Sequence, residues 1–272
     1  MLIRILVSVV LAPLFLAVIL FLPTICLALL MAAICALASF ELLRATRVAH
    51  HNRMYVCTAL AAATIPLGHW AGYGTLTVKA VALLLMAALF FIAIRQYDQP
   101  KAVKLEQLMV CLFGGVMIPT FLSTLVQFRG MEHGRYLVML PIICAFLTDV
   151  GAYFVGMFFG RHRGITKVSP NKSMEGYIGG IVSGALFMLL YGVVLEKFAQ
   201  LAVSLPIMAL YGLLGSAITE LGDLSFSLIK RQYGVKDYGD LLPGHGGMLD
   251  RFDSMVFAAP MLLVLVEVLP AF

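Results

Sequence analysis

Residues 5–41 read ILVSVVLAPLFLAVILFLPTICLALLMAAICALASFE and contain two successive apolar runs, 5–22 and 24–41. Each run is close to the roughly 20 apolar residues that a helix needs to cross the hydrocarbon core of a bilayer. The first run has no small-residue cleavage site and leads directly into the second, so we expect a retained helix rather than a cleavable signal peptide. This stretch therefore predicts a helical membrane protein.

The same pattern continues along the whole chain. Its 272 residues are 62% hydrophobic and 12% charged, with a mean hydropathy of +1.00, whereas soluble domains are about 45–50% apolar. Nine apolar runs are separated by charged breaks, at about 5–22, 24–41, 54–73, 75–94, 106–127, 136–159, 176–195, 201–228 and 254–271. We therefore predict an all-α fold, a polytopic transmembrane helical bundle of about nine spans, as one integral membrane domain over residues 1–272.

Lysine and arginine residues are distributed unevenly between alternate loops. With the N-terminus in the cytoplasm, the outer face receives Arg129, Arg135 and Lys197, with Lys79 near that face. The cytoplasmic face receives Arg4, Arg44, Arg47, Arg53, Arg95, Lys101, Lys104, Arg161, Arg163, Lys167, Lys172, Lys230, Arg231, Lys236 and Arg251. This asymmetry follows the positive-inside rule for nine spans, with the N-terminus cytoplasmic and the C-terminus outside. The net charge of +5 therefore reflects membrane topology, and no nucleic-acid partner is expected.

The two halves of the chain differ in where their ionisable residues lie. In residues 1–140 the charged side chains fall in loops, so we expect mainly scaffold helices there. In residues 141–272 the carboxylates of Asp149, Glu220 and Asp223 lie inside apolar runs. A carboxylate in a span is costly unless it faces a cavity, a cation or a partner, which makes each of these a functional candidate. The second half is therefore the predicted catalytic half.

Five polar residues recur at steps of three or four in the run before the last loop: Glu220, Asp223, Ser227, Lys230 and Arg231. On a helix this spacing places them on one face, with the carboxylates at the deep end and the cations at the cytoplasmic end. The pattern predicts a polar cleft that opens to the cytoplasm. The alternative is an intramembrane salt-bridge network that only fixes helix packing.

The loop after this run reads KDYGDLLPGHGGMLDRFD over residues 236–253, and its glycines can bring backbone N–H groups close to a phosphate. Two carboxylate groups, Asp223 with Glu220 and Asp250 with Asp253, suit a hard cation such as Mg²⁺. The positive charge that a polyphosphate needs would come from Lys230, Arg231, Lys236, His245 and Arg251. Together these residues indicate metal-assisted phosphoryl or nucleotidyl transfer.

A second basic loop, GRHRGITKVSPNKSMEGYIGG at residues 160–180, is expected on the same side of the membrane. Ser173 is placed to cap the helix that follows, with Glu175 in its first turn. Helix N-termini bind anions, and Lys167 and Lys172 would strengthen such binding. The alternative is a positive loop that only sets topology. In the helix itself, Gly176, Gly180 and Gly184 predict close packing, either within the bundle or in a dimer.

Residues 227–253 resemble the signature of the phosphatidate cytidylyltransferases, also called CDP-diacylglycerol synthases. The matching positions are Ser227, Lys230, Arg231, Lys236, Asp237, Gly239, Pro243, His245, Gly246, Gly247, Asp250, Arg251 and Asp253. The resemblance extends upstream over roughly residues 148–255, through TDVGAYFVGMFFG, SPNKSMEGYIGG and ELGD. The second of these is similar to the family's SPKKTWEG block but has Asn171, Ser173 and Met174 where Lys, Thr and Trp are usual.

The resemblance implies transfer of CMP from CTP to phosphatidic acid, giving CDP-diacylglycerol and pyrophosphate in phospholipid biosynthesis. It implies a multi-pass protein of the cytoplasmic membrane with its active site on the cytoplasmic side, a requirement for Mg²⁺ with room for a second cation, and a homodimer. A CTP-dependent lipid kinase or a cytidylyltransferase acting on another lipid phosphate is the alternative. A cation-coupled transporter is more distant, because transporters usually have repeated halves and no repeat is evident.

On this resemblance we assign roles residue by residue. The predicted catalytic residues are Asp223, Lys230, Asp250 and Arg251. The predicted metal ligands are Asp223 and Asp250, with Glu220, Asp253 and Asp149 as further candidates. The predicted substrate-binding residues are Lys167, Ser169, Lys172, Ser227, Arg231, Lys236, His245, Gly246 and Gly247.

Overall fold

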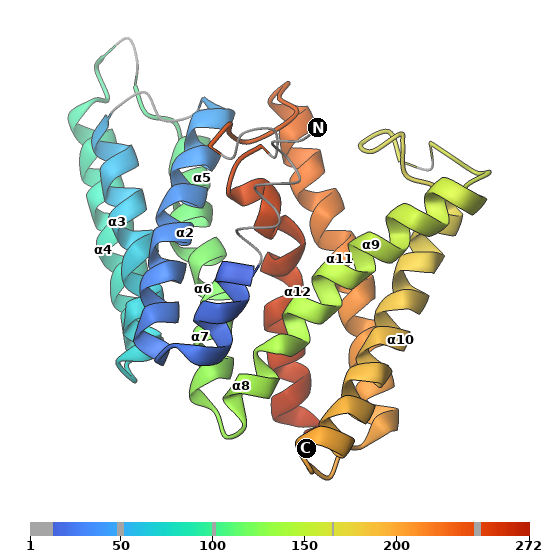
Figure 1. Ribbon diagram of the computed structural model, residues 1–272. Coiled ribbons are helices and arrows are strands. Elements are labelled where there is room, and N and C mark those ends of the chain that lie inside the picture. The colour runs from blue at the N-terminus through green and yellow to red at the C-terminus, as the bar shows by residue number, and fades with distance from the viewer. Residues whose placement is uncertain (1–12, 48–51, 100–101, 165, 242–245) are drawn as a thin grey trace. The chain divides into compact units, whose positions relative to one another are not determined.

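The computed structural model describes residues 13–47, 52–99, 102–164, 166–241 and 246–272 (Figure 1). The described residues are mainly helical and contain no strand, and an isolated bridge pairs Arg163 with Ser173. Six segments are long and apolar enough to cross a membrane: Thr24–Thr46, Gly74–Arg95, Leu105–Gly130, Gly134–Phe159, Met174–Phe198 and Leu205–Gln232. The predicted all-α fold is confirmed for the described residues, where six candidate spans are found against the about nine predicted.

The described helices follow the predicted apolar runs closely. Residues 13–21 are helical, whereas residues 5–12 of the first run, and Arg4 before it, lie outside the described residues. The run predicted at 201–228 forms α11 (Leu205–Gln232), which therefore extends four residues further than its apolar pattern. Lys230 and Arg231 occupy its last turn, where positive side chains interact favourably with the helix dipole.

The chain divides into two compact units, which we describe separately. Unit 1 comprises residues 1–132 and 232–252, and unit 2 comprises residues 133–231 and 253–272. Helix α12 (Leu249–Val268) thus contributes its first four residues to unit 1 and the remainder to unit 2.

Unit 1 is built from α2 (Thr24–Thr46), α3 (Asn52–Trp70), α4 (Gly74–Arg95) and a broken helical segment. That segment runs through α5 (Leu105–Leu112), a π-helical turn η1 (Phe113–Met117), α6 (Ile118–Leu122) and α7 (Thr124–Gly130). Helix α3 packs against both α2 and α4. A Cβ atom at Gly115 would lie 2.7 Å from the Leu85 side chain and 2.9 Å from the Thr58 side chain. A glycine is therefore needed for η1 to approach α3 and α4 this closely.

Unit 2 contains α8 (Gly134–Leu137), α9 (Met139–Phe159), α10 (Met174–Phe198), α11 and most of α12. Helices α9 and α10, yellow-green and gold in Figure 1, pack against each other. A Cβ atom at Gly180 would lie 3.1 Å from the Ala152 side chain on α9 and 2.8 Å from Glu220 Oε1 on α11. The glycine face of α10 therefore packs within unit 2. This is the first of the two predicted alternatives, packing within the bundle or in a dimer.

Candidate active site

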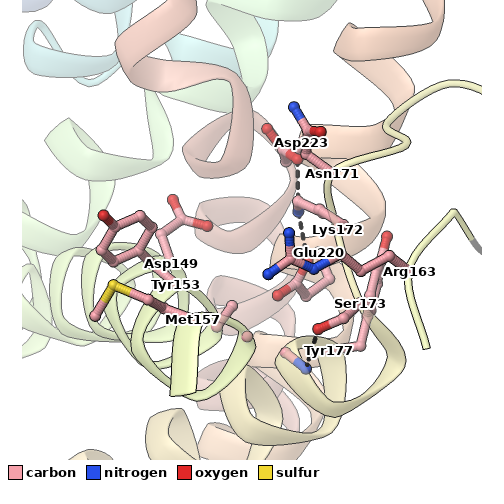
Figure 2. A pocket seen from close by; sticks show the side chains of 13 residues that line it. Asp149, Tyr153, Met157, Arg163, Asn171, Lys172, Ser173, Tyr177, Glu220 and Asp223 are labelled. Atoms are coloured by element: carbon pink, nitrogen blue, oxygen red, sulfur yellow. Dashed lines mark hydrogen bonds and ion pairs between the residues drawn. The ribbon is translucent and has the colours of Figure 1, made fainter. Parts of the chain in front are cut away.

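A pocket of about 440 Å³ lies within unit 2, lined by residues of α9, α10 and α11 and by Arg163, Asn171, Lys172 and Ser173 (Figure 2). Its charged lining includes Asp149 from α9, Lys172 from the loop before α10, and Glu220 and Asp223 from α11. We call the pocket with these four residues the carboxylate pocket. The sequence predicted all four as site residues, and the structure brings them together.

Lys172 lies between two of the carboxylates, as the dashed lines in Figure 2 show. Its Nζ atom is 2.7 Å from Glu220 Oε2 and 2.6 Å from Asp223 Oδ2. Burial opposes the charged form of this lysine, but the two carboxylates outweigh burial and raise the pKa of Lys172 above its ordinary value. The ammonium group is therefore held as a cation between the two acids.

One carboxylate oxygen of the carboxylate pocket is buried without a hydrogen-bond partner among the described residues. The Glu220 side chain is 2% exposed, and its Oε1 atom has no hydrogen-bond partner among the described residues. A buried carboxylate oxygen without a partner is costly, so this atom is suited to a cation or to a water in a cation's shell. Mg²⁺ binds through one or two carboxylates together with waters and substrate phosphate, and the side chains of Glu220 and Asp223 fit that requirement.

The carboxylates alone do not form a complete metal cage. Across the residues that the structure describes, no group of three or more His, Cys, Asp or Glu side chains could hold a metal ion by itself. A cation in the carboxylate pocket would therefore depend on ligands from substrate or water, as Mg²⁺ commonly does.

A chain of polar contacts links α9, α11 and α12 within unit 2. Lys230 Nζ is 3.8 Å from Asp253 Oδ2, and both residues are buried. Asp253 Oδ1 accepts a hydrogen bond from the backbone N–H of Ser254 at 2.8 Å, and the Ser254 hydroxyl donates to Asp149 Oδ2 at 3.2 Å. The structure thus places Lys230 against a carboxylate rather than at an exposed position.

The basic loop before α10 is fixed at both ends. Ser173 Oγ accepts a hydrogen bond from the backbone N–H of Gly176 at 3.1 Å, which confirms the predicted cap. Glu175 accepts from the backbone N–H of His162 and contacts its ring Nδ1 at 2.6 Å. Arg231 donates to the carbonyl of Val168 at 3.4 Å and so ties the loop to the end of α11.

The remaining predicted substrate-binding residues of unit 2 differ in exposure. Lys167 is exposed, whereas Ser169 and Ser227 are half-buried. Lys167 is therefore accessible to a ligand from solvent.

In unit 1, Asp250 organises the loop that follows α11. Its Oδ2 atom accepts hydrogen bonds from the backbone N–H groups of Tyr238, at 2.8 Å, and Gly247, at 3.0 Å. Gly246 has a φ of +84°, in the left-handed region that favours glycine. Lys236 and Arg251 are exposed. His245 lies outside the described residues.

Sequence analysis did not single out Glu41, which the structure places at the same loop. Glu41 lies on α2 and is 5% exposed. Its Oε1 accepts from the backbone N–H of Met248 at 2.9 Å, and its Oε2 accepts from that of Leu249 at 2.8 Å. The available signal was a carboxylate set directly between apolar residues, Phe40 and Leu42, at the end of a predicted span.

Asp223 belongs to unit 2 and Asp250 to unit 1. Each is described within its own unit, and the pairing of these two carboxylates around one metal stays a prediction.

Fold and site together define a helical protein with several candidate membrane spans, in which carboxylates gather around a half-buried lysine. The model of the Cytidylyltransferase family matches residues 2–269. The chain therefore belongs to this family.

Curated relatives agree with this assignment. A phosphatidate cytidylyltransferase of Bacillus subtilis is 40% identical over 141 residues, which cover 52% of this chain and 51% of the relative. One of Staphylococcus epidermidis is 39% identical over 138 residues, 51% of this chain and 52% of the relative. One of Staphylococcus aureus is 38% identical over 138 residues, with the same coverage. The chain spans about half the length of the curated relatives it matches.

Proposed function

We propose that this protein is a phosphatidate cytidylyltransferase, which transfers CMP from CTP to phosphatidic acid. A phosphate oxygen of phosphatidate would form a bond to the α-phosphorus of CTP. The bond from that phosphorus to the oxygen bridging to the β-phosphate would break, and pyrophosphate would leave with the electron pair. The observation that carries the proposal is the carboxylate pocket, in a chain of the cytidylyltransferase family.

For this reaction the protein must mainly neutralise negative charge and align the two substrates. The attacking phosphate is already an anion, so a strong general base is unnecessary, whereas repulsion between the two anionic substrates must be overcome. Lys172 is half-buried and Lys230 is buried, both beside carboxylates, while Lys236 and Arg251 are exposed. The two paired lysines would balance charge within the site, and the exposed cations would bind phosphate groups.

Asp223 and Asp250 would hold Mg²⁺, which when bound neutralises charge on the α-phosphate and on the leaving pyrophosphate. Glu220, Asp253 and Asp149 are further candidate ligands, including for a second cation. Glu220 and Asp149 line the same pocket as Asp223, which supports their inclusion.

The proposal includes the arrangement in the membrane. It places the protein in the cytoplasmic membrane as a homodimer with nine spans per subunit, the N-terminus and the active site on the cytoplasmic side and the C-terminus outside. Two observations support this topology. The described residues include a helical segment at each of the nine apolar runs. Lysine and arginine are also distributed unevenly between alternate loops.

Incubation of the purified protein with α-labelled CTP and phosphatidate tests the proposed reaction. Label recovered in the lipid product is expected. Label that remains in CDP would instead indicate a CTP-dependent lipid kinase, and turnover only with a different lipid phosphate would reassign the acceptor. Substrate counterflow in vesicles without any CTP turnover would indicate a transporter.

A further inference from the structure

We infer that Glu41 is a positioning residue for the active site, because its carboxylate holds the start of α12 and the adjoining loop in the geometry that binds CTP. The inference deepens the proposed function and rests on it. Glu41 is separated by about two hundred residues from the backbone groups that it binds.

The hydrogen bonds of Glu41 use both carboxylate oxygens. Oε1 accepts from the N–H of Met248 and Oε2 from the N–H of Leu249, the first residue of α12. The first N–H groups of a helix have no partner within the helix and require one from elsewhere. Glu41 supplies that partner from α2, which fixes the position of the α12 N-terminus within unit 1.

Steric contacts make the same arrangement specific. A Cβ atom at Gly239 would lie 2.7 Å from Glu41 Oε1, and one at Gly247 would overlap the same carboxylate. Both glycines therefore allow the loop backbone to approach the Glu41 carboxylate closely. Any other residue at position 239 or 247 would require the Glu41 carboxylate or the loop to shift, which would alter this arrangement.

Asp250 completes the arrangement from within the loop. It accepts from the N–H groups of Tyr238 and Gly247, while Glu41 accepts from those of Met248 and Leu249. Three consecutive backbone donors, at 247, 248 and 249, are therefore committed to protein carboxylates. These donors set the shape of the loop, and phosphate groups would be bound by side chains that the loop presents, such as those of Lys236 and Arg251.

The test replaces Glu41 with glutamine in the full-length protein, which keeps the side-chain length but puts an amide N–H₂ where one acceptor oxygen stood. Loss of a hydrogen bond to a buried charged group is expected to raise the hydrogen-exchange rate of the Met248 and Leu249 amides about tenfold. The KM for CTP is expected to rise by a similar factor. Glu41→Ala should have a larger effect on both quantities.

Glu106→Gln is the matched control, because Glu106 is an exposed glutamate in the same unit. It should change neither quantity. A purely structural role would lower the fraction of active enzyme without moving the KM for CTP. An unchanged KM in Glu41→Gln, or a raised KM with unchanged exchange at 248 and 249, would therefore overturn the inference. A wild-type protein that does not label lipid from CTP would refute the proposed function instead, and exchange would still report on the Glu41 contact.

Discussion

Lys172 shows how a single residue defines the state of the carboxylate pocket. Its ammonium group lies within 2.7 Å of one carboxylate and 2.6 Å of another, in the kind of position that a metal ion takes between acidic ligands. Glu220 is buried, so removal of the lysine would leave a buried carboxylate without its compensating charge, which is costly. Lysine and metal would therefore compete for Glu220 and Asp223.

We expect Lys172→Met to bind Mg²⁺ at least about tenfold more tightly in the absence of CTP, because a neighbouring positive charge shifts affinity for a second cation as it does for a proton. Turnover should nevertheless fall, because the substrates lose a cation. Calorimetric titration of the purified protein with Mg²⁺ measures the affinity. Lys197→Met, at an exposed lysine on α10, is the control. Weaker Mg²⁺ binding by Lys172→Met would contradict the competition.

Asp223→Asn and Asp250→Asn should each abolish Mg²⁺-dependent conversion of CTP and phosphatidate, while membrane insertion remains intact. Asparagine keeps one oxygen acceptor, so at position 250 it can still accept hydrogen bonds from the loop N–H groups of Tyr238 and Gly247. The loss should therefore come from the missing negative charge rather than from unfolding. Turnover is measured with labelled CTP, and near-normal rates in both variants would refute the assigned metal role.

At the scale of helices, unit 2 depends on glycine-mediated packing of α9, α10 and α11. A Cβ atom at Gly184 would lie 2.6 Å from Thr148 Oγ1 and would overlap Ser216. Those two hydroxyls are joined by a hydrogen bond of 2.7 Å between α9 and α11. The α10 glycines therefore allow three helices to approach closely around a buried polar contact.

Gly184→Ala should lower stability by about 1–3 kcal/mol, the usual cost of overpacking a well-packed interior. Thermal unfolding of the purified protein in detergent measures the change as a lower midpoint. Gly130→Ala, where an added Cβ meets no atom within 4 Å, should leave the midpoint unchanged. Equal midpoints for Gly184→Ala and the wild-type protein would show that α10 does not pack as described.

Helix α11 shows what the spacing of residues along the sequence can predict and what it cannot. Steps of three and four correctly placed Glu220, Asp223 and Lys230 on one helix. They did not show that Lys230 is paired with Asp253 or that Asp223 is paired with Lys172. Those partners come from other elements, and local spacing carries no information about which element packs alongside.

At the scale of the whole molecule, the proposed topology makes the loops after α10 and α11 face opposite sides of the membrane. The test starts from a variant in which the five native cysteines, all buried or half-buried, are replaced. In this background, Asp240→Cys should react with an impermeant thiol reagent only from the cytoplasmic side. Lys197→Cys should react only from the outside. Both positions are exposed. Labelling of the two cysteines from the same side would refute the topology.

The sequence by itself determined the all-helical membrane fold, the positions of the helices and the family. Hydropathy over about 20 residues and the spacing of side chains on one helix are local properties, so they follow directly from the order of the residues. Only the tertiary structure decided that Lys172 lies between Glu220 and Asp223, and that Glu41 binds the start of α12. Buried charges and backbone donors must find partners wherever packing brings one within hydrogen-bond distance, and packing joins residues far apart in the chain.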